Sequence, residues 1–462
     1  MGVSAELRDW AEQHFAAAQL GDPRRTRRLV DAAAAIGAEP ALAFPQIFDW
    51  NALRGLYRLC DQERATLEAV QGPHWQQTRR AMRQQPLVLT VHDTSELDYS
   101  SHHHMAGRGQ IGNEGGRGLL QHNSLAIVPQ PRAVLGLAYQ QLRARQPAPA
   151  DESPYQRKRR PRESDLWRAG FVAAGRPPAG CCWVDVADRG GDDYETLRAA
   201  RQVEHHFLVR ATQDRVVFLE PTGQRQAHLL QYARCLPSQG SDVVPIRGRG
   251  GRPPRTAVVS LSGAPVWIPA PAGTAQRWSQ PILAAWVIRI WEPQPPAGVK
   301  EPLEWILLCS LPSATLAELK ERRDWYCCRW LVELFHDAEK NGCGVEERRF
   351  ATAERMETCV ALLSVVAVRV LQLRTALEAQ PAAAAAAVGT AEEIDLVRQL
   401  VGAPAGPLTV RAFVRGVGRL GGFLGRRGDG EPGVRALWRG YQRLRDMVLG
   451  VRLRQLTLID TS

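Results

Sequence analysis

Apolar residues recur at helical spacing in three stretches of the chain. The first runs from residue 7 to about residue 70, the second from Leu316 to Leu377, and the third from Ala412 to Leu456 with a loop inside it. A repeat near 3.6 residues is typical of helices that bury one face. The pattern therefore predicts helical regions at both ends of the chain and a long helical region ahead of the last one.

Short apolar runs bounded by polar residues, glycine or proline predict strands in the middle of the chain. These runs are Leu87–Val91, Ser124–Val128, Val134–Tyr139 and Cys182–Ala187. The first leads into Asp93 and the last leads directly into Asp188. A strand-rich stretch at about 207–311 follows before helical spacing returns.

Composition and charge narrow the class of partner. The 462 residues are enough for two or three domains, and 59 Lys and Arg against 48 Asp and Glu give a net charge of +11. A basic balance favours a polyanionic partner. A GC-rich genome inflates arginine in the same way, so the placement of the arginines has to decide between the two explanations.

The nine cysteines show no C-x-x-C spacing, which predicts reduced thiols and argues against a zinc site. No apolar run approaches the roughly 20 residues that a membrane span needs, and the first twenty residues are charged rather than signal-like. We therefore expect a cytoplasmic protein with no membrane partner.

Four arginines crowd the start of a predicted helix near the beginning of the chain. Asp22 is suited to cap this helix, and Pro23 to occupy its first turn. Arginine side chains and a helix N-terminus both attract phosphate. The arginines are Arg24, Arg25, Arg27 and Arg28. DNA contact and a solvated charged face explain this segment equally well.

Asp93 and Asp188 lie at the ends of predicted strands. Carboxylates held there suit two-metal phosphoryl chemistry, because Mg²⁺ prefers oxygen ligands and a strand is a rigid support. An aspartate after a strand also commonly serves as a turn or cap residue. The two positions alone leave both interpretations open.

A third carboxylate, Glu333, belongs to a set of polar residues at helical intervals. Tyr326, Arg329, Glu333 and Lys340 are spaced by three, four and seven residues, so a helix near residues 325–341 would carry them on one face. An ordinary i,i+4 salt bridge between Arg329 and Glu333 explains part of the same pattern.

The motif Tyr-x-x-Arg-x-x-x-Glu-x-x-x-x-x-x-Lys formed by these four residues resembles the signature of the IS4 family of insertion-sequence transposases, most closely its Tn5 (IS50) branch. Similar segments occur at Leu20–Thr26, Asp93–Ser95, Asp188–Arg189, Arg329–His336 and Arg419–Phe423. The resemblance therefore spans nearly the whole sequence.

The resemblance implies an α/β fold with an RNase H-like (DDE) catalytic core. It implies a helical DNA-end-binding domain at residues 1–70, a catalytic domain at 71–375 with a β-strand insertion at about 207–311, and a helical C-terminal dimerisation module at 390–462. A bacterial transposase would work in the cytoplasm, in association with the nucleoid.

The implied activity is cut-and-paste transposition. In the family, Asp93, Asp188 and Glu333 would bind two Mg²⁺ ions, with Mn²⁺ as a substitute, and an activated water would nick the transposon end. The freed 3′-hydroxyl would form a hairpin, which is reopened before the end is joined to target DNA. The ions would lower the pKa of the water and stabilise charge on the entering and leaving oxygens. The implied partners are double-stranded DNA, as terminal repeats and target, and a second copy in a synaptic homodimer.

Other residues align with positions that hold DNA in the family. Arg210, Tyr326 and Arg329 would hold phosphate near a flipped base, Trp305 would stack on that base, and Lys340 would contact end DNA. Stacking offsets the cost of extruding a base. Trp305-Ile306-Leu307-Leu308 is also typical of a buried strand, and the N-terminal arginines match the family only partly.

Two positions depart from the family pattern. Gly190-Gly191 after Arg189 predicts a more flexible loop beside Asp188, and Asp337 places a negative charge where a basic residue would favour DNA. The alternatives are a catalytically silent DNA-binding relative or inhibitor of transposition, and an RNase H-like nuclease that does not join strands. The intact carboxylates favour the active enzyme. The histidine run His102–His104 is assigned to a loop, with no role.

Overall fold

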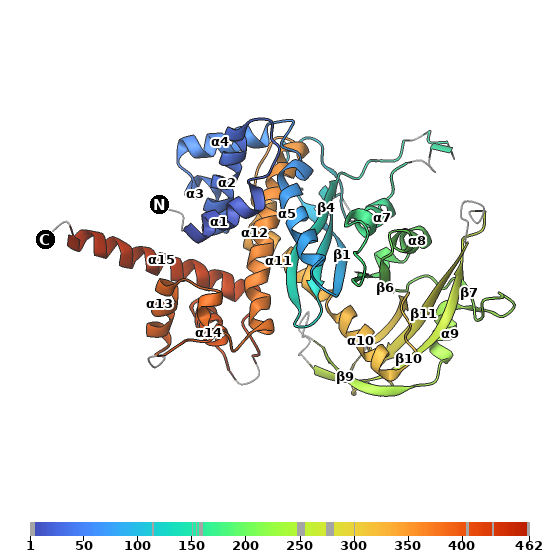
Figure 1. Ribbon diagram of the computed structural model, residues 1–462. Helices are drawn as coiled ribbons and strands as arrows, with labels where there is room; N and C mark the ends of the chain where they lie inside the picture. Colours follow the sequence, from blue (N-terminus) through green and yellow to red (C-terminus); the bar gives the residue numbers. More distant parts are fainter. Residues whose placement is uncertain are drawn as a thin grey trace.

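The chain is a mixed α/β protein built around one 12-stranded sheet with helices on both sides (Figure 1). The computed structural model describes residues 5–112, 115–149, 151–153, 155–156, 160–246, 255–273, 281–299, 301–402, 406–426 and 429–459. The coarse prediction of an α/β fold is confirmed.

Five helices form the N-terminal region. They are α1 (Ala5–Phe15), α2 (Pro23–Ala38), α3 (Phe44–Ile47), α4 (Trp50–Cys60) and α5 (Leu67–Met82). Asp22 caps α2 by accepting a hydrogen bond from the Arg24 backbone N–H at 2.8 Å, and Pro23 occupies the first turn. The predicted helix start is therefore confirmed.

The central part of the sheet has the strand order β4-β3-β1-β5-β6. Its strands are β1 (Leu87–Asp98), β3 (Arg117–Val128), β4 (Ala133–Arg143), β5 (Cys182–Ala187) and β6 (His206–Arg210), with the short β2 (Gly109–Gln110) beside β3. The first three long strands are antiparallel, whereas β1, β5 and β6 are parallel.

Strands β1 and β3 run well beyond their apolar segments. They pair with each other from Leu89↔Ile127 to Asp98↔Gly118, so backbone hydrogen bonds carry both strands through polar residues. The prediction that β1 ends near Asp93 is therefore wrong. An apolar run marks where a strand is buried, and cross-strand pairing decides where it stops.

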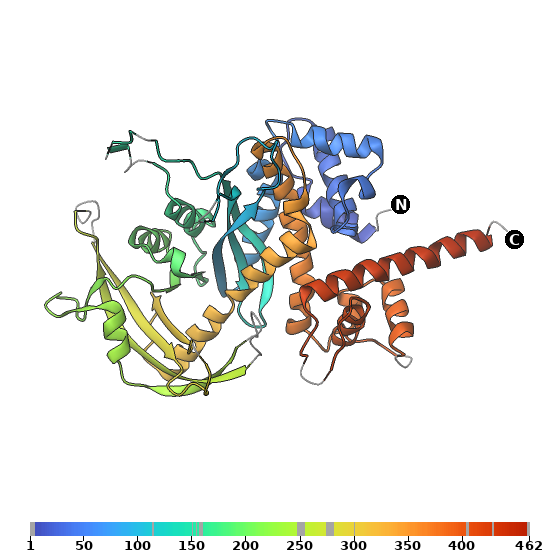
Figure 2. The ribbon, with the colours of Figure 1, turned by 180° about the vertical axis from the view of Figure 1, so that it is seen from behind.

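Helices cover both faces of the central strands. Helices α5 and α12 (Ala353–Ala379) pack on one face, and α7 (Ser164–Ala173) and α8 (Tyr194–Gln202) lie on the other (Figures 1 and 2). The predicted strand-rich insertion extends the same sheet, because β12 pairs with β6. Its elements are β7 (Val216–Phe218), β8 (Gln226–His228), α9 (Leu229–Cys235), β9 (Gly240–Ile246), β10 (Arg255–Pro269), β11 (Ile282–Trp291) and β12 (Glu304–Cys309). Residues 247–254, 274–280 and 300 of the predicted insertion lie outside the described part.

The helical region that carries the Tyr-Arg-Glu-Lys motif is not one helix. It consists of α10 (Leu316–Cys327), α11 (Trp330–Asp337) and a π-helical turn, η3 (Ala338–Gly342). The prediction that all four residues share one face of a single helix is therefore wrong. A π turn holds one more residue than an α turn, and such turns recur at functional sites.

The C-terminal region forms a small helical module. Helices α13 (Ala391–Val401), α14 (Val410–Leu420) and α15 (Val434–Ile459) surround their own core, which includes Phe413 and Leu444. The far end of α15 projects away from the rest of the protein (Figure 2). In the histidine run, His102 is buried against Tyr99, and its two neighbours are exposed.

Helix α12 is unusually long and apolar. By length and composition, Ala353–Leu377 of α12 is apolar enough to cross a membrane, contrary to the expectation from the sequence. In the structure, 76% of the relevant window is buried inside the protein, between the sheet, the N-terminal helices and the C-terminal module. A core helix of this kind has the same composition as a membrane span.

Candidate active site

Asp93 and Asp188 come directly after the parallel pairing of two neighbouring strands. The pairing of β1 with β5 ends at His92↔Ala187; Asp93 is the next residue of β1, and Asp188 is the residue that follows β5. Asp93 is inside β1, but it is the first residue beyond the parallel ladder. The two carboxylates therefore share the carboxyl edge of the parallel part of the sheet.

Arg329 joins the third carboxylate to this edge. Its Nη1 lies 3.5 Å from Oδ2 of Asp93, and its Nη2 makes an ion pair with Glu333, one turn along α11. The Arg329 side chain is only 18% exposed. A partly buried guanidinium therefore lies between two of the predicted metal ligands.

The pKa of Asp93 reflects its burial and the other carboxylates at this edge of the sheet. Burial raises it from 3.8 to about 7; Arg329 opposes the rise, and the nearby charges of Asp188 and Glu333 add to it. Each carboxylate is thus close enough to disfavour ionisation of Asp93. The structure therefore brings all three predicted catalytic residues together.

This carboxylate cluster has the right chemistry for Mg²⁺ without being a formed metal site. Three carboxylates supply the hard oxygen donors that Mg²⁺ prefers. Within the described ranges, however, no three His, Cys, Asp or Glu side chains are grouped so that they could hold an ion. The Arg329 guanidinium supplies the positive charge between Asp93 and Glu333.

The glycines after Asp188 form a fixed turn, contrary to the predicted flexible loop. Asp188 accepts a hydrogen bond from the Gly190 backbone N–H at 2.8 Å and caps the 3₁₀ turn η1 (Arg189–Gly191). A Cβ at Gly190 would lie 2.4 Å from the Trp167 ring. Glycine therefore lets the turn pack closely against α7, and the turn holds Asp188.

An aromatic pair borders the carboxylates on the side of the insertion. Trp305 of β12 and Tyr326 of α10 meet edge to face, with ring centroids 5.2 Å apart. Arg210 donates to the Glu304 carbonyl at 3.2 Å. Burial raises the pKa of Tyr326, and the nearby charges of Arg329 and Arg210 oppose the rise. The structure thus brings Arg210, Trp305 and Tyr326 together. Trp305 is half-buried, so part of its side chain remains accessible from solvent.

Lys340 lies apart from the carboxylate cluster. Its ammonium donates to the Glu96 carbonyl and pairs with Glu346 at 3.3 Å, near the far end of β1. The π turn changes the helical phase between Glu333 and this lysine. Asp337 accepts a hydrogen bond from Asn341 at 2.7 Å.

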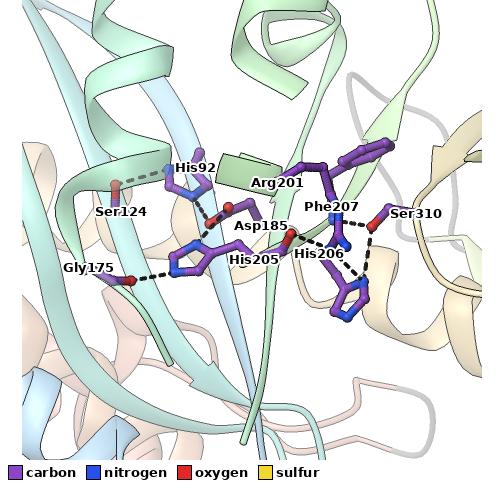
Figure 3. A network of polar contacts seen from close by, with 9 residues as sticks. All are labelled: His92, Ser124, Gly175, Asp185, Arg201, His205, His206, Phe207 and Ser310. Carbon is purple, nitrogen blue, oxygen red and sulfur yellow. Dashed lines mark hydrogen bonds and ion pairs between the residues drawn. The ribbon is translucent and has the colours of Figure 1, made fainter. Parts of the chain in front are cut away.

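A buried ionic network fixes the strands just behind the aspartates (Figure 3). Asp185 of β5 bonds His92 through Oδ1 at 2.9 Å and His205 through Oδ2 at 3.0 Å, and Ser124 lies 2.9 Å from the other His92 nitrogen. Burial acts to raise the pKa of Asp185, but the two histidines hold it below its ordinary value. The network joins β1, β3 and β5 one residue before Asp93.

A second charged site lies between α2 and α4. A cavity of about 350 Å³ is lined by Arg25, Arg28, Asn51, Arg54, Gly55, Arg58, Leu59 and Gln62. A Cβ at Gly55 would overlap the Arg28 guanidinium, so the glycine makes room for it. We call these eight residues the arginine pocket.

The arginine pocket divides the four predicted N-terminal arginines. Arg25 and Arg28 line it, whereas Arg24 and Arg27 do not. Sequence reasoning missed Arg54 and Arg58. Their spacing of four residues on α4 places them on one helix face, and this signal was available in the sequence.

Comparisons with known proteins match both ends of the chain. Residues 7–65 match a family model described as transposase DNA-binding, and residues 401–457 match one described as the transposase Tn5 dimerisation domain. Among solved structures, a piggyBac transposase synaptic complex with hairpin DNA is similar at 10% identity and a TM-score of 0.33. That match covers 97% of this chain and 73% of the other, and a TM-score so low does not define the fold.

The two family matches support one class of protein, a DNA transposase that binds DNA and forms dimers. Within that class, the dimerisation model is the one described for Tn5. The two matches therefore support a Tn5/IS4-like transposase, in agreement with the resemblance in the sequence.

Proposed function

We propose that this transposase is an active cut-and-paste enzyme, which cleaves the terminal repeats of its transposon and joins them to target DNA. The observation that carries the proposal is the meeting of Asp93, Asp188 and Glu333 at one edge of the sheet. These residues are far apart in the sequence, yet the fold brings their three carboxylates together and raises the pKa of one of them. Such an arrangement is typical of a functional site.

We further propose that the catalytic core is RNase H-like. The order β4-β3-β1-β5-β6, with three antiparallel strands followed by two parallel ones, supports this assignment. The proposed domains are residues 1–70 for end binding, 71–375 for catalysis with the insertion at about 207–311, and 390–462 for dimerisation. The two matched family models fall largely within the first and last of these ranges.

Asp93, Asp188 and Glu333 are the proposed ligands of two Mg²⁺ ions, with Mn²⁺ as a substitute. When bound, such ions lower the pKa of an attacking water and stabilise charge on the entering and leaving oxygens. Arg329 has to leave the carboxylates for this to happen, and a DNA phosphate is a suitable new partner for its planar guanidinium.

The DNA would extend from the arginine pocket to the aromatic pair. The pocket offers four guanidinium groups to backbone phosphates, which is the usual source of affinity for DNA. Trp305 and Tyr326 would receive an unstacked base at a hairpin end, with Arg210 and Lys340 on nearby phosphates. A synaptic homodimer would hold both ends, and the work would take place on nucleoid DNA in the cytoplasm.

A catalytically silent DNA-binding relative is the second candidate. It is favoured by one observation: in the described structure, Arg329 rather than a metal site lies between Asp93 and Glu333. Such a protein would keep the arginine pocket and the dimerisation module, and would bind transposon ends without cutting them.

The deciding experiment incubates the purified chain and Glu333→Gln with Mg²⁺ and DNA carrying the terminal repeats of its own element. We expect 3′ nicks and hairpins from the wild type, slowed on the order of 1000-fold in the variant because a metal ligand is lost. A mobility-shift assay on both proteins controls for DNA binding. Equal binding with no cleavage by either protein, with Mn²⁺ also tried, would establish the silent relative instead.

A further inference from the structure

A buried set of polar side chains connects the sheet to the helix that carries Glu333. We call the following residues the amide network: Gln71, Gln121, Asn123, Gln140, Glu339 and Ser364. All six are essentially inaccessible to solvent, and they come from α5, β3, β4, the π turn and α12. Such a network is costly in a protein interior unless its geometry is satisfied, so it specifies one arrangement of the elements that it joins.

One end of the network lies directly beside the catalytic aspartate. Asn123 of β3 is the cross-strand partner of Asp93 on β1, so both side chains point to the same face. The Asn123 Nδ2 lies 2.8 Å from Nε2 of His336 on α11. His336 is three residues after Glu333, one turn further along the same helix. A single hydrogen bond therefore joins the neighbour of one catalytic carboxylate to the neighbour of another.

The direction of this bond is determined by its surroundings. Gln140 donates to Oδ1 of Asn123 at 2.7 Å, which leaves the Asn123 NH₂ group facing His336. Burial, with Lys340 and Arg329 nearby, lowers the pKa of His336 to about 3, so the ring is neutral and its Nε2 accepts. Gln140 is itself held by Gln71 at 2.7 Å.

The other branch of the network reaches the π turn. Glu339 Oε1 accepts from Gln121 at 2.8 Å and from Ser364 at 2.6 Å. Among the described residues, Oε1 of Gln121 and Oε2 of Glu339 are buried acceptors without a partner. Burial raises the pKa of Glu339 to about 7, which favours its protonated form. In this form the amide network is uncharged.

We propose that Asn123 and His336 are positioning residues, which hold α11 against β3 and thereby set the separation of Glu333 from Asp93. This inference rests on the proposed function. The rest of the amide network holds Asn123 in the donating orientation and anchors the π turn that follows α11. Neither residue touches the reacting atoms; both act through the carboxylates that they align.

The test measures single-turnover nicking of terminal-repeat DNA by the full chain as a function of Mn²⁺ concentration. The variants are His336→Leu and Asn123→Leu, which remove the bond, and His336→Gln, which keeps an acceptor at a similar distance from the backbone. Ser262→Ala is the matched control, because Ser262 is equally buried in the insertion and, among the described residues, its hydroxyl has no partner. Thermal unfolding and end-binding affinity are recorded for each protein.

Both leucine variants are expected to need about tenfold more Mn²⁺ for half-maximal nicking, as is usual when the support of a metal ligand is removed. Their DNA affinity should stay at the wild-type value, and His336→Gln should recover most of the loss. An unchanged Mn²⁺ requirement in the folded leucine variants would overturn the inference, as would a failure of His336→Gln to recover. If the wild type itself does not nick under any Mn²⁺ concentration, the proposed function fails instead, which is a different result.

Discussion

The carboxylate cluster and the arginine pocket differ in how their charges are neutralised. At the cluster, Arg329 contacts both Asp93 and Glu333, so the protein balances its own charge before any ligand arrives. In the pocket, four arginines face one cavity, and none of the eight described lining residues is acidic. The pocket therefore has no acidic residue among its described lining that would repel phosphate, whereas at the proposed metal site an internal cation already pairs with the carboxylates.

The difference suggests an order of events. DNA would bind first through the pocket, because none of its four arginines forms an ion pair with a carboxylate of the described residues. A phosphate that then reaches Arg329 would compete with the carboxylates for the guanidinium, and release of the carboxylates would favour metal binding. Coupling of this kind is reciprocal, so metal would also strengthen the binding of DNA at that phosphate.

The largest expected effect concerns the arginine pocket. Arg28→Ala combined with Arg54→Ala should weaken binding to terminal-repeat DNA on the order of 100-fold, because two charge-assisted contacts to phosphate are lost. The slope of log affinity against log salt should fall by about two. Fluorescence anisotropy at several salt concentrations measures both quantities.

Arg176→Ala is the matched control, since Arg176 is an exposed arginine that pairs with Glu204 outside the pocket. Equal losses in the control and the double variant would mean that overall charge, and not the pocket, determines DNA affinity.

The next effect concerns Glu339, a buried carboxyl group whose negative charge is neutralised by a proton and not by an arginine. The pKa of Glu339 is raised from 4.5 to about 7 in the folded protein, so its neutral form is favoured there. Its contribution to stability is complete below the unfolded pKa and is lost as pH rises through the folded pKa. Between about pH 5.5 and about pH 8.5, the wild type should lose about 2 kcal/mol that Glu339→Gln does not lose. Urea unfolding of both proteins at the two pH values checks this; parallel pH profiles would contradict it.

The smallest expected effect concerns Arg329. Arg329→Met should bind Mn²⁺ about tenfold more tightly than the wild type in the absence of DNA, because the competing cation is gone. The titration, followed by the electron paramagnetic resonance signal of free Mn²⁺, is best done at about pH 8.5, since loss of the arginine raises the pKa of Asp93 further. Glu333→Gln serves as the control that should weaken binding. Equal Mn²⁺ affinity of Arg329→Met and wild type would remove the contrast between the two sites.

Much of the catalytic core follows from local patterns in the sequence. Apolar runs locate β1, β5 and the strands between them, and Asp22 with Pro23 marks the start of α2. The places of Asp93 and Asp188 after these runs mark them as strand-end carboxylates, and only the parallel pairing of β1 with β5 shows that they share an edge. The link to Glu333 came from the resemblance, since spacing along a helix says nothing about which strand it packs against.

Other features depend on contacts that the sequence does not display. The π turn that moves Lys340 away from Glu333 has no signature in the apolar pattern. In the sequence, Gly190 suggests a flexible loop. Only the structure shows that the Trp167 ring lies so close that a side chain at this position would overlap it. Hydrogen bonds of the amide network join residues up to 224 positions apart, as between Gln140 and Ser364, so in the sequence its members look like isolated polar residues.

The central claim, that the three carboxylates are metal ligands for DNA cleavage, is tested most directly by changing the metal that the site prefers. Asp188→Cys replaces a hard oxygen by a soft sulfur, which Mn²⁺ tolerates better than Mg²⁺ does. Terminal-repeat nicking is measured in Mg²⁺ and in Mn²⁺ for this variant and the wild type, with DNA binding as the control. The account predicts that Asp188→Cys binds DNA normally, is inactive in Mg²⁺ and regains activity in Mn²⁺. Full activity of Asp188→Cys in Mg²⁺ would contradict it, because Asp188 would then be no ligand of the catalytic metal.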